Sequence, residues 1–141
     1  YNPLAGGLLT GKYAGIDEGQ QQAKGRFGEA SPISGAAYSD RYWKKAIFEA
    51  LVPIRAACTE HHLDLAAASL RWLMHHSILS PSHGDGIIIG ASTLAHAQVN
   101  LAACAEGPLP QAVVRAFDEA WAIARPVAFP YFRDYGRKAG S

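Results

Sequence analysis

The first thirteen residues, YNPLAGGLLTGKY, combine groups that could hold a ligand. Tyr1 carries a flat aromatic ring at the start of an apolar stretch, and Lys12 supplies a positive charge near its end. Between them the Gly6-Gly7 pair lets the backbone approach a ligand closely, because glycine has no side chain. Taken alone, the pair more simply indicates a tight turn, and only the motifs further along the chain favour ligand contact.

A second group that could bind a ligand follows the apolar run GIIIGAS, residues 86–92. Ser92 and Thr93 are each suitable N-caps for a helix that begins at this point. The unpaired backbone N–H groups and the dipole of a helix N-terminus attract anions, phosphate in particular. Capping and phosphate binding are compatible uses, because both depend on the same backbone donors.

Histidine and tryptophan could also do chemistry, but their positions favour structural roles. The pairs His61-His62 and His75-His76 lie near expected helix ends, where a protonated imidazole complements the dipole. Adjacent helical positions point apart and no carboxylate or cysteine completes a ligand set, so we expect no metal site. The tryptophans have apolar neighbours at helical spacing and are expected in the core: Trp43, Trp72 and Trp121.

Two short strands are expected to position the candidate ligand-binding groups. Residues 1–4 form the first strand. Residues 86–91 form the second, and their continuous apolar character suits burial on both faces, as in a parallel sheet. Residues 15–37 show no hydrophobic period and are expected to form a long mobile loop, and residues 127–141 a flexible tail.

Helices are expected where capping residues precede apolar positions spaced by about 3.6 residues. Three expected ranges are 40–61, 64–76 and 111–124. A further helix is expected to begin at Ser92 or Thr93, to run through Ala102 and to be ended by residues 106–108. Asp40 and Asp64 are the expected N-caps of the first two helices, and Pro53 is expected to kink the first. The alternation of strands and helices indicates an α/β fold. Two parallel strands cannot cover themselves, so we expect their neighbours to come from residues before Tyr1.

Composition narrows the class of protein. The 141 residues are 49% hydrophobic, which is globular composition, and the net charge of +1 offers no basic field for nucleic acid. Cys58 and Cys104 lie among alanines in expected helices, so we expect buried thiols in a reducing compartment rather than a disulfide. The apolar runs are far shorter than the roughly 20 residues of a membrane-spanning helix, and no secretory leader is visible. We therefore expect a cytoplasmic protein without a membrane partner.

Seven segments that cover nearly the whole chain stand out: YNPLAGGLLTGKY (1–13), GRFG (25–28), RYW (41–43), SLRWLMHHS (69–77), HGDGIIIGAST (83–93), QVNLAACAEGPLP (98–110) and YFR (131–133). In this order and with this spacing they resemble the C-terminal part of an aldo-keto reductase. More narrowly, they resemble the aflatoxin-aldehyde and succinic-semialdehyde reductase subfamily.

This resemblance implies a (β/α)8 barrel that uses NADPH to reduce aldehydes and ketones. Such a barrel needs about 250 residues, so the chain would supply only strands 7 and 8 with their helices, an incomplete barrel. Residues 1–141 are thus expected to be the C-terminal segment of the oxidoreductase domain, and residues 15–37 a loop that covers the coenzyme.

The resemblance also implies which residues contact NADP(H). Tyr1 would stack on the nicotinamide ring, and Arg26 would contact the coenzyme from the loop. The N-terminus of the helix that begins at Ser92 or Thr93 would receive the 2′-phosphate. The full implied set is Tyr1, Asn2, Pro3, Leu4, Gly6, Gly7, Leu8, Thr10, Lys12, Arg26, Ser92, Thr93, His96 and Asn100. Arg133 resembles a residue that holds the carboxylate of an acidic aldehyde.

The family's catalytic Tyr, Lys, Asp and His would all precede Tyr1, so we carry no catalytic residue over and expect the chain alone to be inactive. The expected substrate is a small aldehyde or ketone, and the full-length protein could form a homodimer. One alternative is a truncated, non-catalytic relative that serves as a binding or interaction module through its unpaired strands. Another is a free-standing helical domain.

Overall fold

The computed structural model describes residues 1–17, 27 and 35–130. Within these ranges the chain forms helices and irregular connections, and no strand. The elements in chain order, with η denoting a short 3-10 helix, are η1 (Ala5–Thr10), α2 (Gly35–Tyr42), α3 (Lys45–Glu60), α4 (Leu65–His75), η3 (Pro81–His83), α5 (Leu94–Ala105), α6 (Gln111–Ala124) and η4 (Arg125–Val127).

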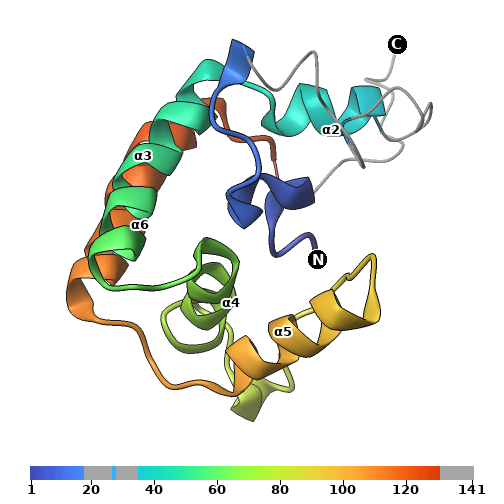
Figure 1. Cartoon of the computed structure of the whole chain (residues 1–141), viewed down its shortest axis with the longest axis vertical. Coiled ribbons are helices and arrows are strands. Elements are labelled where there is room, and N and C mark those ends of the chain that lie inside the picture. The colour runs from blue at the N-terminus through green and yellow to red at the C-terminus, as the bar shows by residue number, and fades with distance from the viewer. Residues whose placement is uncertain (18–26, 28–34, 131–141) are drawn as a thin grey trace, which may run out of the picture.

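Helices α3 and α6 pack side by side along one edge of the molecule (Figure 1). Lys44, which precedes α3, donates from Nζ to the carbonyl oxygen of Val127 beyond the end of α6, at 2.9 Å, so the two helices run antiparallel. Their facing sides join α4 in one hydrophobic cluster. Its buried members are Ala50, Ile54, Cys58, Leu65, Ala68, Leu109, Val113 and Ala120.

A second, largely aromatic cluster joins the N-terminal segment to α2 and to the first turns of α3. Its buried members are Leu8, Tyr13, Phe27, Tyr38, Tyr42, Phe48 and Leu51. The rings meet mainly edge to face, as for Tyr13 and Phe27, whose centroids are 5.6 Å apart at 89°. Such contacts add to simple area burial, because the positive edge of one ring meets the negative face of the other. This aromatic cluster fixes η1 beside α2.

Local signals placed several helices correctly. Asp64 is the N-cap of α4, and its Oδ1 accepts a hydrogen bond from the backbone N–H of Ala67 at 2.9 Å. Of the two candidates before α5, Thr93 is the N-cap. The structure also confirms the expected bounds of α6, Gln111–Ala124.

The first expected helix is different in the structure. Asp40 lies inside α2 and is not an N-cap, so this prediction was wrong. The chain is already helical from Gly35, within the expected loop, and breaks at Lys44, whose φ of −129° and ψ of 142° are extended. Helix α3 then continues through Pro53 to Glu60.

Neither expected strand is present in the described residues. Asn2 and Ala5 have φ values of 55° and 47°, in the left-handed region, so residues 1–5 turn instead of extending. Residues 86–91 form no regular structure, and Ile88 is 70% exposed. A strand is stabilised by hydrogen bonds to a neighbouring strand, and no described segment pairs with either stretch. The assignment of strands 7 and 8 to these residues is therefore not confirmed.

Parts of two further predictions fall elsewhere. Of the expected loop, residues 15–37, and the expected tail, residues 127–141, the segments 18–26, 28–34 and 131–141 lie outside the described residues.

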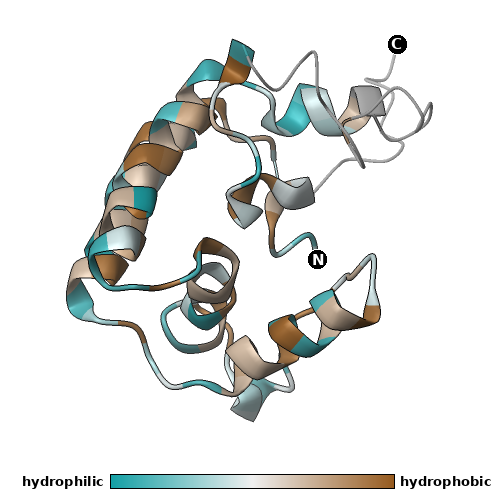
Figure 2. Ribbon diagram, in the orientation of Figure 1, coloured by the Kyte–Doolittle hydropathy of each residue, from teal (hydrophilic) through white to brown (hydrophobic). Residues whose placement is uncertain are grey.

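No helix of the described ranges is long and apolar enough to cross a membrane. Figure 2 shows apolar stretches on α5 as well as on α3 and α6, and Leu94 at the start of α5 is 77% exposed.

Candidate functional site

The N-terminal segment folds into two successive turns. The backbone N–H of Ala5 donates to the carbonyl oxygen of Asn2 at 3.0 Å, and that of Gly7 donates to the carbonyl oxygen of Leu4 at 2.8 Å. Asparagine is one of the few residues that tolerate the left-handed conformation that Asn2 adopts here. The turns gather the candidate residues of this segment into a compact unit.

The two glycines of this segment have different surroundings. Their φ values of 68° and 105° lie in the region open to glycine. A Cβ on Gly6 would lie 2.7 Å from Cδ1 of Tyr38 and 3.1 Å from Cζ of Phe27, so the chain's own rings fill that space. A Cβ on Gly7 would lie 3.2 Å from Nζ of Lys12. Gly6 therefore permits aromatic packing, whereas Gly7 leaves room for an ammonium group directly beside the backbone.

The other candidate residues of this segment differ in exposure. Tyr1 is 53% exposed and Lys12 is exposed, so both side chains can meet a ligand. Leu8 is fully buried and belongs to the aromatic cluster, so its side chain cannot. The exposed Thr10 donates from Oγ1 to the carbonyl oxygen of Gly7 at 2.7 Å. The half-buried candidates are Asn2, Pro3 and Leu4.

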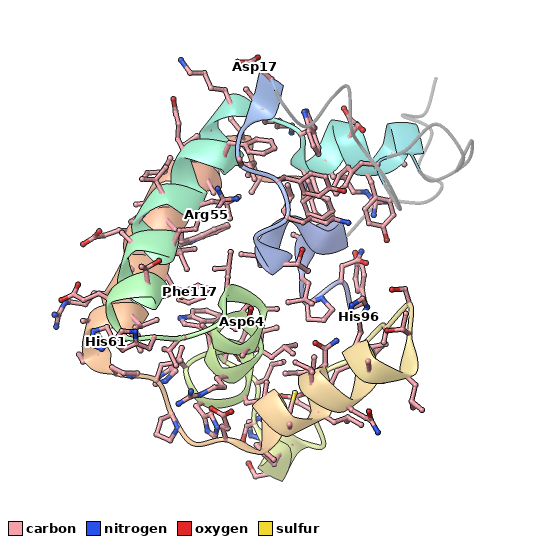
Figure 3. The ribbon with its side chains drawn as sticks, viewed as in Figure 1. Asp17, Arg55, His61, Asp64, His96 and Phe117 are labelled. Atoms are coloured by element: carbon pink, nitrogen blue, oxygen red, sulfur yellow. The ribbon has the colours of Figure 1, made fainter. Side chains whose placement is uncertain are left out.

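Arg55 ties the end of this segment to α3. Its guanidinium reaches across from the helix and donates from Nη1 to the carbonyl oxygen of Ala14 at 3.0 Å and from Nη2 to that of Tyr13 (Figure 3). These bonds satisfy two carbonyls that have no sheet partner in the described residues. The aromatic cluster thus holds the segment at Leu8 and Tyr13, and Arg55 of α3 adds two hydrogen bonds at its end.

The N-terminus of α5 is the second candidate region. Oγ1 of Thr93 accepts from the backbone N–H of His96 at 3.1 Å, and Oγ of Ser92 lies 3.0 Å from Nδ1 of the His96 ring (Figure 3). Residues 92–96 are all exposed. The first N–H groups of a helix have no partner within it, and the dipole adds positive potential there. This end of α5 can therefore receive an anion.

Asn100 has a different setting from the rest of the candidate set. Asn100 is 7% exposed, and its Nδ2 donates to the carbonyl oxygen of Gly90 at 3.4 Å. The amide thereby connects α5 to the irregular segment that leads into it. Arg26 and Arg133 lie outside the described residues.

The histidine pair at the end of α4 has a role that the sequence did not reveal. Nε2 of His76 accepts a hydrogen bond from the backbone N–H of Leu109 at 2.9 Å, and Nε2 of His75 lies 2.7 Å from the carbonyl oxygen of Glu106. Burial lowers the pKa of His76, with His75 and Arg71 adding to the effect and Asp118 opposing it. The pair holds the connection between α5 and α6, and no local pattern signals such long-range bonds.

The cysteines and acidic groups offer no further chemistry in the described part of the chain. Both thiols are free, and burial raises the pKa of Cys58, with Asp64 adding to the rise, and also that of Cys104. A raised pKa disfavours the reactive thiolate. No group of three or more His, Cys, Asp or Glu among the described residues could hold a metal ion.

Comparison with known proteins supports the resemblance. The sequence matches the family model described as Aldo/keto reductase family over residues 1–122. It is 44% identical over 137 residues to the human protein named aflatoxin B1 aldehyde reductase member 2, covering 94% of this chain and 38% of that protein.

Two more relatives extend the comparison. Human aldo-keto reductase family 7 member A3 is 43% identical, with 94% of this chain and 41% of that protein covered. Aldo-keto reductase pigE of Monascus ruber is 37% identical, with 92% and 38% covered. The chain thus spans about two fifths of the length of these curated relatives. The model match covers most of the 141 residues, and the chain belongs to the aldo/keto reductase family, whose fold is a (β/α)8 barrel.

Proposed function

We propose that this chain supplies the coenzyme-holding part of an NADPH-dependent reductase of small aldehydes and ketones. Membership of the aldo/keto reductase family supports an oxidoreductase, and the human relative at 44% identity is named an aldehyde reductase. The coenzyme would supply the hydride, and this chain's residues would bind and orient it. We assign no residue of this chain to the proton transfer that must accompany hydride transfer.

The observation that carries this proposal is the exposed N-terminus of α5. Ser92 and Thr93 stand there beside the first N–H groups of the helix. Oγ1 of Thr93 accepts from that of His96, and those before it have no acceptor within the helix. The 2′-phosphate that distinguishes NADPH from NADH suits such an end, because its charge meets both the donors and the dipole. In this proposal Thr93 keeps the helix capped and Ser92 contacts the phosphate.

The N-terminal segment would hold the rest of the coenzyme. The ammonium of Lys12 lies beside the bare backbone of Gly7, an arrangement that suits a negatively charged diphosphate. Tyr1, which is 53% exposed, would stack on the nicotinamide. Arg26 remains a proposed contact to the coenzyme, and Arg133 a proposed contact to an acidic group on the substrate.

The test is a titration of NADPH into the purified chain, followed by the fluorescence of the coenzyme. Helical circular dichroism shows that the sample is folded. Saturable binding, tighter for NADPH than for NADH, is the expected result. The absence of any saturable change in a folded sample contradicts the proposal.

Ser92→Asp makes this test specific for the 2′-phosphate. A carboxylate at a helix N-terminus is compatible with the dipole, so we expect no loss of stability. The same charge would repel a phosphate, and NADPH binding should weaken about five- to tenfold while NADH binding changes little. Ser92→Ala is the uncharged control, and equal weakening for both coenzymes would exclude a phosphate contact at this position.

A further inference from the structure

Tyr38 of α2 touches the N-terminal segment at two points. Its hydroxyl donates to Oδ1 of Asn2 at 2.9 Å, although the two residues are 36 positions apart in the sequence. Its ring edge lies where a side chain on Gly6 would be, with Cδ1 2.7 Å and Cε1 3.1 Å from an added Cβ. These contacts lie on either side of the turn at residues 3–4. Tyr38 therefore contacts the chain on both sides of that turn.

The aromatic cluster holds Tyr38 in place. Its ring centroid lies 6.1 Å from that of Phe27 at 89° and 5.9 Å from that of Tyr42 at 43°. The guanidinium carbon of Arg41 lies 5.7 Å from the Tyr38 centroid, over the ring. A side chain packed on three sides keeps one rotamer, so its hydroxyl is presented in a fixed place.

The amide of Asn2 connects Tyr38 to the candidate ligand-binding residues. Burial raises the pKa of Tyr42, and the charge of Arg41 and the side chain of Asn2 partly offset that rise. Asn2 has a φ of 55°. Fixing its side chain therefore fixes a left-handed backbone, and with it the direction in which Tyr1 leaves the turn.

We propose that Tyr38 is a positioning residue for the nicotinamide end of the coenzyme: its hydroxyl holds Asn2 in the left-handed conformation and so directs Tyr1. This inference rests on the proposed function. It assigns a division of labour, in which α2 sets the nicotinamide half of the site and the N-terminus of α5 holds the 2′-phosphate half. The Tyr38 hydroxyl acts through Asn2 and does not itself touch the coenzyme.

Tyr38→Phe in the full chain is the variant that tests this proposal. It keeps the ring over Gly6 and removes only the hydroxyl, so the fold should be retained. The loss of one hydrogen bond predicts NADPH binding weaker by about three- to tenfold. Binding of 2′-phospho-ADP, which has no nicotinamide, should be unchanged. A merely structural role would weaken both ligands alike.

A second variant shows whether the hydroxyl acts through Asn2. Asn2→Gly keeps a backbone that accepts positive φ and removes the amide, so adding Tyr38→Phe to it should change NADPH binding no further. Unchanged NADPH binding in folded Tyr38→Phe, equal weakening of both ligands, or a full additional loss in the Asn2→Gly background overturns the inference. If the unmodified folded chain binds neither 2′-phospho-ADP nor NADPH, the proposed function fails and this inference fails with it. If the unmodified chain binds both and only the Tyr38 result is negative, the proposed function stands.

Discussion

Arg71 of α4 donates from Nη1 to Oε2 of Glu106 at 2.8 Å, but this ion pair is the smaller part of what the guanidinium does. Its Nε donates to the carbonyl oxygen of Gly107 at 2.8 Å, and its Nη2 to that of Pro108 at 2.9 Å. The Arg71 side chain is 11% exposed, whereas that of Glu106 is 55% exposed. Arg71 is therefore the internal fastening of the connection between α5 and α6.

Substitution of the two partners should have unequal effects. Arg71→Met removes three hydrogen bonds and leaves backbone carbonyls without donors, so we expect a loss of about 2–4 kcal/mol in the free energy of unfolding. Glu106→Gln keeps an acceptor in a half-exposed place, and a loss of less than about 1 kcal/mol is expected. Urea denaturation followed by helical circular dichroism measures both. Similar losses for the two variants would show that the ion pair, not the carbonyl contacts, fastens the connection.

His76 makes the same connection sensitive to pH. Its Nε2 can accept from the Leu109 N–H only when that nitrogen carries no proton. The ring faces His75 and Arg71 on α4 and Asp118 on α6, and burial is the main reason for its lowered pKa. In the unfolded chain the ring takes up a proton near its ordinary pKa of about 6.5. Between the two pKa values the unfolded state binds more protons, so stability rises with pH.

The expected outcome is a loss of stability as the pH falls below about 6.5. His76→Gln offers a side-chain oxygen as acceptor and does not titrate, so it should lose part of this pH dependence. Urea midpoints for both proteins at several pH values between neutral and mildly acidic conditions provide the measurement. The difference between the two curves isolates His76 from the other histidines, and parallel curves would mean that the Leu109 contact does not depend on its protonation.

The N-cap of α4 can be tested independently of the site. Asp64→Ala removes the acceptor for the Ala67 N–H and should lower the free energy of unfolding by about 1 kcal/mol. Asp64→Asn retains an oxygen in the same place and serves as the matched control, with a change of only a few tenths expected. Thermal unfolding by circular dichroism compares the two. Equal destabilisation would point to the carboxylate charge rather than the hydrogen bond.

The predictions that the structure confirms are those with local causes. Asp64 and Thr93 cap helices through bonds that span three residues, and such bonds can be recognised in sequence. The two expected strands are not confirmed, because a strand depends on partners that are remote in sequence. Asp40 has the chemistry of a cap, but the helix around it starts earlier, at Gly35. A suitable residue type indicates a cap only when the chain before it is not already helical.

The candidate site follows the same division between local and distant causes. The sequence singled out groups at the start of α5, which the structure shows to be exposed, and a glycine pair, of which Gly7 lies beside Lys12. It could not show that Gly6 is covered by Tyr38, because that contact joins a turn to a helix more than thirty residues away. Nor could it show that Asn100 is buried and bonded to Gly90. Long-range packing decides which members of a motif remain available to a ligand.

The different surroundings of two glycines yield the last prediction. Gly6 and Gly11 have φ values of 68° and 79°, so alanine at either position is strained in the backbone by about 1–2 kcal/mol. At Gly11 nothing lies within 4 Å of an added Cβ, and the backbone strain is the whole effect. At Gly6 the added atom also lies 2.7 Å from the Tyr38 ring. The ring cannot easily move away, because it is packed in the aromatic cluster.

We therefore expect Gly6→Ala to lower the free energy of unfolding by about 2–4 kcal/mol, against about 1–2 kcal/mol for Gly11→Ala. Urea denaturation measures the difference between the two variants, which reports the clash alone because the backbone strain is common to both. Tyr38→Leu in the Gly6→Ala background should recover part of the loss, since it replaces the rigid ring with a smaller and more adaptable side chain. If both glycine variants lose the same stability, the Tyr38 ring does not confine Gly6. Tyr38 would then hold the N-terminal turn through its hydrogen bond to Asn2 alone.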